Sequence, residues 1–155
     1  MKTESKYCLI VTGGSVDQNL LATVYEGAYG YPVHPYVIGV DKGLEMLEQL
    51  DIEPDLIIGD FDSANDGIRA KYVTSPDAVV REKCVVLNPE KDFTDTHVAV
   101  LEAAKRGFTR ALLLGATGTR LDHTLGNMGL LFTCEQEGIC LLYTSDAADD
   151  LIGVD

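Results

Sequence analysis

Residues 55–63 read Asp55-Leu56-Ile57-Ile58-Gly59-Asp60-Phe61-Asp62-Ser63, a short apolar run that ends in two aspartates separated by one residue. The apolar run predicts a buried β-strand, and the small and acidic residues that follow predict a turn. Two carboxylates on one turn offer the oxygen ligands that a hard cation such as Mg²⁺ prefers. The alternative interpretation is an acidic turn in which an aspartate caps the next helix.

The same pattern occurs at three other places in the chain. The apolar run 36–40 precedes Asp41, the run 84–87 precedes an acidic segment at 90–95, and the run 111–114 precedes a glycine-rich segment at 115–123. Parallel strands end at the same edge of a sheet, and ligands bind beyond that edge. We therefore expect the four segments to meet there and to form a magnesium–phosphate site.

Strand-like and helix-like segments alternate along the whole chain, which predicts an α/β fold. The expected architecture is a doubly wound, mostly parallel sheet of about six strands with helices on both faces. Strands are expected at residues 7–12, 36–40, 56–59, 84–87, 111–114 and 139–143, and helices at 15–27, 42–50, 65–72, 94–106 and 121–136. Ser15 is expected to cap the first helix. In the fourth helix the expected apolar face is Val98, Leu101, Ala103 and Ala104, with Gly107 as its end.

Composition excludes several classes of function. The 155 residues include 25 acidic and 12 basic side chains, for a net charge of −13, which would repel a nucleic-acid backbone. No apolar run approaches the ~20 residues of a membrane-spanning helix. The four cysteines show no CxxC spacing, and buried thiols are expected at Cys8 and Cys84. Reduced cysteines and the lack of a signal-peptide pattern favour a cytoplasmic protein.

Three of the aspartates lie next to expected helix starts. Asp41, Asp92 and Asp95 therefore each have a second interpretation as a helix cap or first-turn acid, and Thr94 is an alternative cap. Lys91 follows the apolar run 84–87 and directly precedes Asp92. It is a candidate phosphate contact.

Turns of small residues follow two of the expected strands, at 115–118 and at 13–15. The turn 115–118 would let backbone N–H groups approach a phosphate, although it lacks the Lys-Ser/Thr ending of a Walker loop. Arg120, shortly after it, could neutralise phosphate charge. His123 is either a substrate contact or the donor of a structural hydrogen bond. The turn 13–15 is either a second phosphate-facing turn or an ordinary strand–helix connection.

Four ordered motifs, at residues 40–43, 54–63, 89–96 and 115–127, resemble the N-terminal catalytic domain of the thiamine pyrophosphokinases. The resemblance runs from about residue 7 to residue 138. It implies a transferase that moves a pyrophosphoryl group from ATP to the hydroxyl of thiamine, with Mg²⁺ as cofactor, giving thiamine diphosphate and AMP. The family also implies a homodimer for the full-length protein.

The resemblance assigns roles to residues at matching motif positions. It implies magnesium binding by Asp60, Asp62 and Asp95, an acidic pocket that also contains Asp41, Asp92 and Asp122, and phosphate contacts from Lys91 and Arg120. It places Thr117, Gly118, His123 and Asn127 near the nucleotide. The residue that accepts the hydroxyl proton is open between Asp92 and Asp122.

The chain departs from the family in two respects. Residues 1–139 are expected to be the catalytic domain, and the family's β-rich C-terminal domain is expected to be absent. Residues 140–155 are expected to be an aberrant tail derived from a sequencing adapter, or else a natural acidic tail after a sixth strand.

Two other functions share the acidic platform: a pyrophosphokinase for a hydroxymethylpterin-like alcohol, and a magnesium–nucleotide binding fragment without turnover. A glycosyltransferase with a DxD motif, or a phosphatase with an aspartyl nucleophile, would not explain segments 90–95 and 115–123 together.

Overall fold

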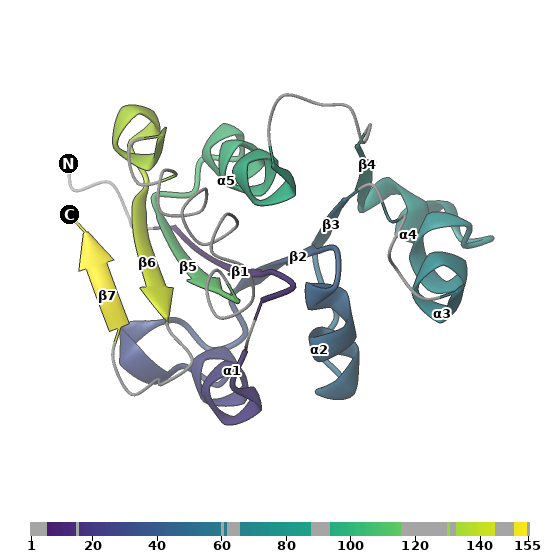
Figure 1. Ribbon diagram of the computed structural model, residues 1–155, viewed down its shortest axis with the longest axis horizontal. Coiled ribbons are helices and arrows are strands. Elements are labelled where there is room, and N and C mark those ends of the chain that lie inside the picture. The colour runs from purple at the N-terminus through teal and green to yellow at the C-terminus, as the bar shows by residue number, and fades with distance from the viewer. Residues whose placement is uncertain are drawn as a thin grey trace.

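The computed structural model describes residues 6–14, 16–59, 61, 66–87, 94–115, 130, 133–144 and 151–154. Its centre is a seven-stranded sheet in the order β4-β3-β2-β1-β5-β6-β7 (Figure 1). The strands are β1 (Tyr7–Val11), β2 (Tyr36–Val40), β3 (Leu56–Gly59), β4 (Cys84–Val86), β5 (Arg110–Leu114), β6 (Cys140–Thr144) and β7 (Leu151–Val154). The first six are parallel, and β7 pairs antiparallel with β6. The predicted α/β fold is confirmed.

Helices cover both faces of this sheet, as expected. They are α1 (Gln18–Tyr25), the 3₁₀ helix η1 (Ala28–Gly30), α2 (Gly43–Gln49), α3 (Asp66–Ile68), the π-helix η2 (Arg69–Val73), α4 (Ala78–Glu82) and α5 (Asp95–Lys105). Residues 130 and 133–137 are also helical, inside the helix that the sequence predicts at 121–136. Figure 1 shows α5 on one side of the sheet and α1 and α2 on the other.

Successive residues of each central strand enter opposite halves of the core. In β1, Cys8 and Ile10 pack on the side of α5, whereas Leu9 and Val11 pack on the side of α1 and α2. All four are fully buried. Because both faces are covered, these strands are continuous apolar runs instead of alternating ones. This explains why their positions could be read from the sequence.

Helix starts and ends follow local capping chemistry. The first helix is capped by Asp17, whose Oδ1 accepts hydrogen bonds from Asn19 N at 2.8 Å and Leu20 N at 3.2 Å. The prediction of a helix from residue 15 was therefore wrong about its start, and the proposed cap, Ser15, lies outside the described residues. At the carboxyl end of α5, Gly107 adopts φ +84°, as predicted for a helix end.

The buried face of α5 differs from the predicted one. Thr96, Ala99, Val100 and Ala103 are buried, whereas Val98, Leu101 and Ala104 are only partly buried. The observed face has the same helical spacing but carries smaller side chains, which allow the helix to lie close to β2 and β3. Only Ala103 belongs to both faces.

Other elements were not predicted or differ in type. The predicted helix at 65–72 is the short α3 followed by the π-helix η2, and α4 and β7 were not expected. The strand expected at 139–143 is β6, which begins at Cys140 and pairs in parallel with β5. The origin of residues 140–155 is not tested by this pairing and stays a prediction. Among the described residues, no helix is both long and apolar enough to cross a membrane.

Candidate active site at the carboxyl edge of the sheet

The strand order reverses direction between β1 and β5. From β1 the sheet continues through β2 to β4 on one side and through β5 on the other. In an open parallel sheet, the crevice at such a switch point, beyond the carboxyl ends of the strands, is where ligands bind. The strands that precede the four predicted site segments are β2, β3, β4 and β5, and all four are parallel. Their carboxyl ends therefore share one edge, as the sequence predicts.

Two of the predicted site residues, Asp41 and Asp95, are described by the structure. The others lie outside the described residues: Asp60, Asp62, Lys91, Asp92, Thr117, Gly118, Arg120, Asp122, His123 and Asn127. Their predicted roles stay predictions.

Asp41 is held in an uncommon backbone conformation directly after β2. Its φ is +47°, in the left-handed region that aspartate tolerates better than most residues. Its N–H donates to the carbonyl oxygen of Ile58 at 3.0 Å, and its own carbonyl accepts from Leu44 N at 3.2 Å. These two bonds fix the turn between β2 and α2 against β3.

The carboxylate of Asp41 has a buried oxygen, Oδ1, with no hydrogen-bond partner among the described residues. The residue at the N-cap position of α2 is Lys42, and no side-chain hydrogen bond caps that helix. The alternative interpretation of Asp41 as a helix cap is thus not supported. A buried carboxylate oxygen without a donor is costly unless something supplies one, and such groups gather at functional sites. This oxygen fits a bound cation or a hydroxyl donor of a substrate.

Asp95 opens α5, which runs back from the carboxyl edge toward the start of β5. Thr94 is the N-cap, and its Oγ1 accepts from His97 N at 3.1 Å. This resolves the cap in favour of Thr94 and leaves Asp95 as the acid of the first helical turn. A carboxylate there is stabilised by the helix dipole, and this role does not exclude metal binding.

Phe61 lies between the two aspartates of the DxD motif in sequence. Its side chain is 1% exposed and belongs to the core on the side of α1 and α2. It adopts φ +63°, and its carbonyl oxygen accepts a hydrogen bond from Arg69 Nη1 at 3.1 Å. The sequence analysis did not assign a role to Phe61 or to Arg69. The signal available in the sequence was an aromatic residue between two acids.

The ends of β1 and β5 are joined at the switch point. Thr12 donates twice to the carbonyl oxygen of Leu114, from its N at 2.9 Å and from its Oγ1 at 3.2 Å. Gly115 follows with φ +82°, and a Cβ placed there would lie 2.6 Å from Thr12 O. A Cβ on Gly13 would lie 2.9 Å from Cβ of Lys42. Glycines thus allow three strand ends to approach closely beneath the candidate site.

The predicted magnesium ligands fall on both sides of the described boundary, with Asp95 inside it and Asp60 and Asp62 outside. Within the described ranges, no three histidine, cysteine, aspartate or glutamate residues form a group that could hold a metal ion. Asp60 and Asp62 are outside those ranges, so the predicted ligand set is not tested. Asp41 offers a cation a buried carboxylate oxygen that has no hydrogen-bond partner among the described residues.

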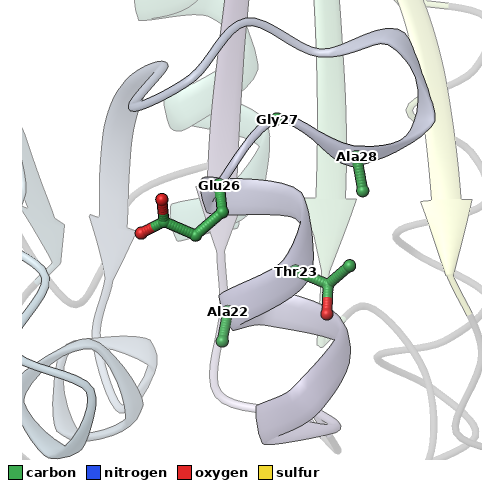
Figure 2. Close-up of a pocket in the computed structure, with 5 residues that line it drawn as sticks. All are labelled: Ala22, Thr23, Glu26, Gly27 and Ala28. Atoms are coloured by element: carbon green, nitrogen blue, oxygen red, sulfur yellow. The ribbon is translucent and has the colours of Figure 1, made fainter.

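Two open surface pockets lie elsewhere on the described chain. One, of about 570 Å³, is lined by residues at the end of α1 and the turn after it: Ala22, Thr23, Glu26, Gly27 and Ala28 (Figure 2). The other, of about 340 Å³, includes Tyr25, His34 and Asp51. Because α1 and α2 run back from the carboxyl edge, their last residues lie toward the amino edge of the sheet. These pockets are therefore separate from the candidate site.

Residues 32–143 match the family described as thiamin pyrophosphokinase, catalytic domain. The chain is 36% identical over 99 residues to the thiamine pyrophosphokinase of Bacillus subtilis (strain 168), covering 64% of this chain and 44% of that protein. Its fold is similar to the crystal structure of thiamine pyrophosphokinase from Bacillus subtilis, with TM-score 0.66, 28% identity and coverage of 89% of this chain and 59% of that one. It is also similar to thiamin pyrophosphokinase from Geobacillus thermodenitrificans, with TM-score 0.64, 29% identity and coverage of 87% and 58%. The chain thus spans less than half the length of the curated relative it matches.

Proposed function

Because the chain belongs to the thiamin pyrophosphokinase catalytic-domain family, we propose that it transfers a pyrophosphoryl group from ATP to the hydroxyl of thiamine, giving thiamine diphosphate and AMP. The observation that carries this proposal is the extent of the family match. It spans residues 32–143, which include all four acidic or glycine-rich segments that follow β2, β3, β4 and β5. Oδ1 of Asp41 lies at the same edge, is buried and has no hydrogen-bond partner in the described ranges, which supports a site that receives a cation or a hydroxyl group.

The proposed chemistry is an in-line displacement at the β-phosphorus of ATP. The thiamine oxygen forms a bond to that phosphorus, the bond from it to the oxygen bridging the α-phosphate breaks, and AMP leaves with the electron pair. Lys91 and Arg120 orient the phosphates, and Asp92 or Asp122 accepts the hydroxyl proton. Magnesium held by Asp60, Asp62 and Asp95 would supply charge neutralisation at the phosphates. Positioning and electrostatic stabilisation account for most of the catalysis in such transfers.

The direct test is to incubate the chain with ATP and thiamine and to quantify AMP and thiamine diphosphate by chromatography. We expect equal amounts of both products with Mg²⁺ and none with EDTA. The chain spans 44% of the curated relative, so nucleotide binding and turnover are tested independently of each other. Calorimetry measures the binding of ATP. Magnesium-dependent ATP binding without AMP release would favour the nucleotide-binding alternative. Product formed from a hydroxymethylpterin, but not from thiamine, would favour the other pyrophosphokinase.

Asp41 and Asp51 provide a matched pair for this assay. Both are aspartates in the left-handed region, with φ +47° and +54°, but Asp51 is exposed and follows the carboxyl end of α2, away from the site. We expect Asp41→Asn to lower turnover by roughly a hundredfold, within the range for loss of a positioned carboxylate. Asp51→Asn should leave turnover unchanged. Equal turnover rates in the two variants would show that Asp41 does not belong to the site.

The cell compartment and assembly state also belong to the proposal. The four cysteines are free, which suits a reducing cytoplasm. The family resemblance implies a homodimer, and light scattering on the purified chain would measure its mass in solution.

A further inference from the structure

Gly59, the last residue of β3, lies beside Asp41 across the β2–β3 pair. Val40 is in register with Ile58, so the next residues on the two strands are neighbours. A Cβ built on Gly59 would overlap Asp41 Oδ1 and would lie 2.9 Å from Asp41 Cγ. The third nearest atom is Asp41 N, at 3.5 Å. Every one of these three nearest atoms belongs to Asp41.

The backbone conformation does not require glycine at this position. Gly59 is absent from the glycines with φ in the left-handed region, and it is a regular strand residue that accepts a hydrogen bond from Leu87 N at 2.8 Å. Glycine inside a strand is otherwise unfavourable, because it adds flexibility to the unfolded chain and contributes no side-chain packing. The space occupied by the Asp41 carboxylate is the feature that accounts for it.

We propose that Gly59 is a positioning residue that seats the carboxylate of Asp41 at the carboxyl edge of the sheet. The missing side chain creates a recess against β3, and Oδ1 of Asp41 enters it without meeting a donor from the residues that the structure describes. A methyl group in the recess would turn the carboxylate away from β3. The functional part of this inference rests on the proposed function, since it assumes that Asp41 serves ATP and thiamine. The steric part does not.

A double-mutant cycle tests the steric part by thermal unfolding of the full chain. Gly59→Ala should lower the unfolding midpoint by roughly 3–9 °C, as expected for an overpacked site. Asp41→Gly removes the carboxylate and suits the positive φ, so Gly59→Ala should cost nothing further in that background. Asp41→Asn keeps the shape but not the charge, and Gly59→Ala should cost as much there as in the natural chain. If Gly59→Ala alone does not fold, recovery of folding in the Asp41→Gly background gives the same answer.

Gly39 provides the control. Like Gly59, it is a glycine within a strand, in this case β2. A Cβ there would meet the side chains of Leu44 and Leu47, the latter at 3.1 Å. Gly39→Ala should therefore keep its cost in the Asp41→Gly background, because removing the carboxylate does not relieve a clash with leucine side chains. Additivity of Gly59→Ala with Asp41→Gly would overturn the proposal.

The functional part is tested by ATP affinity measured with Mg²⁺ and with EDTA. Gly59→Ala should weaken ATP binding by roughly tenfold or more in Mg²⁺, as expected when a binding group is displaced, and should leave the EDTA value unchanged. Gly39→Ala should weaken neither value. If the natural chain shows no magnesium-dependent binding, the proposed function fails while the unfolding cycle still decides the steric relationship. If it binds and Gly59→Ala binds equally well, the positioning role is wrong.

Discussion

The hydroxyl of Thr12 donates a hydrogen bond to the carbonyl oxygen of Leu114 at 3.2 Å, which joins the ends of β1 and β5 at the switch point. Thr12 is only 5% exposed, so this bond lies at the floor of the candidate site and not on the surface. Since the backbone N–H of Thr12 reaches the same oxygen at 2.9 Å, the carbonyl stays paired when the hydroxyl is removed.

Replacing Thr12 with valine should therefore cost about 1 kcal/mol of the free energy of unfolding, the typical net value of one hydrogen bond. The comparison variant is Thr23→Val, which removes an exposed hydroxyl that donates to Asn19 O at 2.6 Å within α1. Its effect should be smaller, because water replaces the lost bond. Denaturation by urea measures both, and equal losses would contradict the buried role of Thr12.

Gly115→Ala should destabilise the chain by roughly 2–4 kcal/mol, through both backbone strain and a clash. Its φ of +82° is unfavourable for alanine, and the new Cβ would lie 2.6 Å from Thr12 O. Gly107→Ala is the control, since its φ of +84° is almost the same but a Cβ there meets nothing within 4 Å. The difference between the two unfolding free energies isolates the close approach of β1 and β5.

Alkylation of the native protein at pH 8 should spare the cysteines on the α5 side of the sheet. Burial raises the pKa of Cys8 to about 12 and that of Cys134 to about 11, so few thiolates form there. Cys84 and Cys140 are partly exposed and should react first. Mass spectrometry of the labelled peptides gives the order, and all four should react after unfolding. Early labelling of Cys8 would contradict the buried position of β1.

The pH dependence of stability should contain a contribution from His97. Partial burial lowers the pKa of its imidazole from the usual 6.5, so the unfolded chain binds a proton more readily than the folded one. The contribution is therefore present above pH ~6.5 and is lost as pH falls through the lowered pKa. Between pH 7 and pH 5, wild type should lose more unfolding free energy than His97→Gln. Parallel curves for the two proteins would show that His97 is not desolvated by folding.

Strands were the part of the fold that could be predicted well. The runs 36–40 and 56–59 match β2 and β3 residue for residue, because strands buried on both faces are continuous apolar segments between turn residues. Short elements were harder to predict. Helix α4 buries none of its residues, so its sequence has no apolar period to detect. The buried face of α5 depends on how closely the helix approaches β2 and β3, which its own sequence does not determine.

For the site, the position of the acids at strand ends was predictable from the order of elements, and Asp41 and Asp95 lie where that order requires. The contacts that these and neighbouring residues make across the fold were not predictable. That Gly59 accommodates Asp41 depends on the register between β2 and β3, and that Phe61 is buried depends on the core beside α1 and α2. In both cases the local sequence shows only the residue type and not the contact that the residue makes.

The position of β1 at the centre of the sheet has a consequence for the order in which the protein assembles. β1 precedes the other described strands in the chain, yet one of its two neighbours is β5, so that Tyr7 can pair with Arg110 only after the later strand has been made. Pairings this distant along the chain form slowly, because the entropy of closing a long loop must be lost before the contacts stabilise it. During synthesis on the ribosome, β1, β2 and β3 can associate early, but one side of β1 stays unpaired until β5 emerges. We therefore expect this side of β1 to be the strand edge most in need of protection from aggregation in a newly made chain.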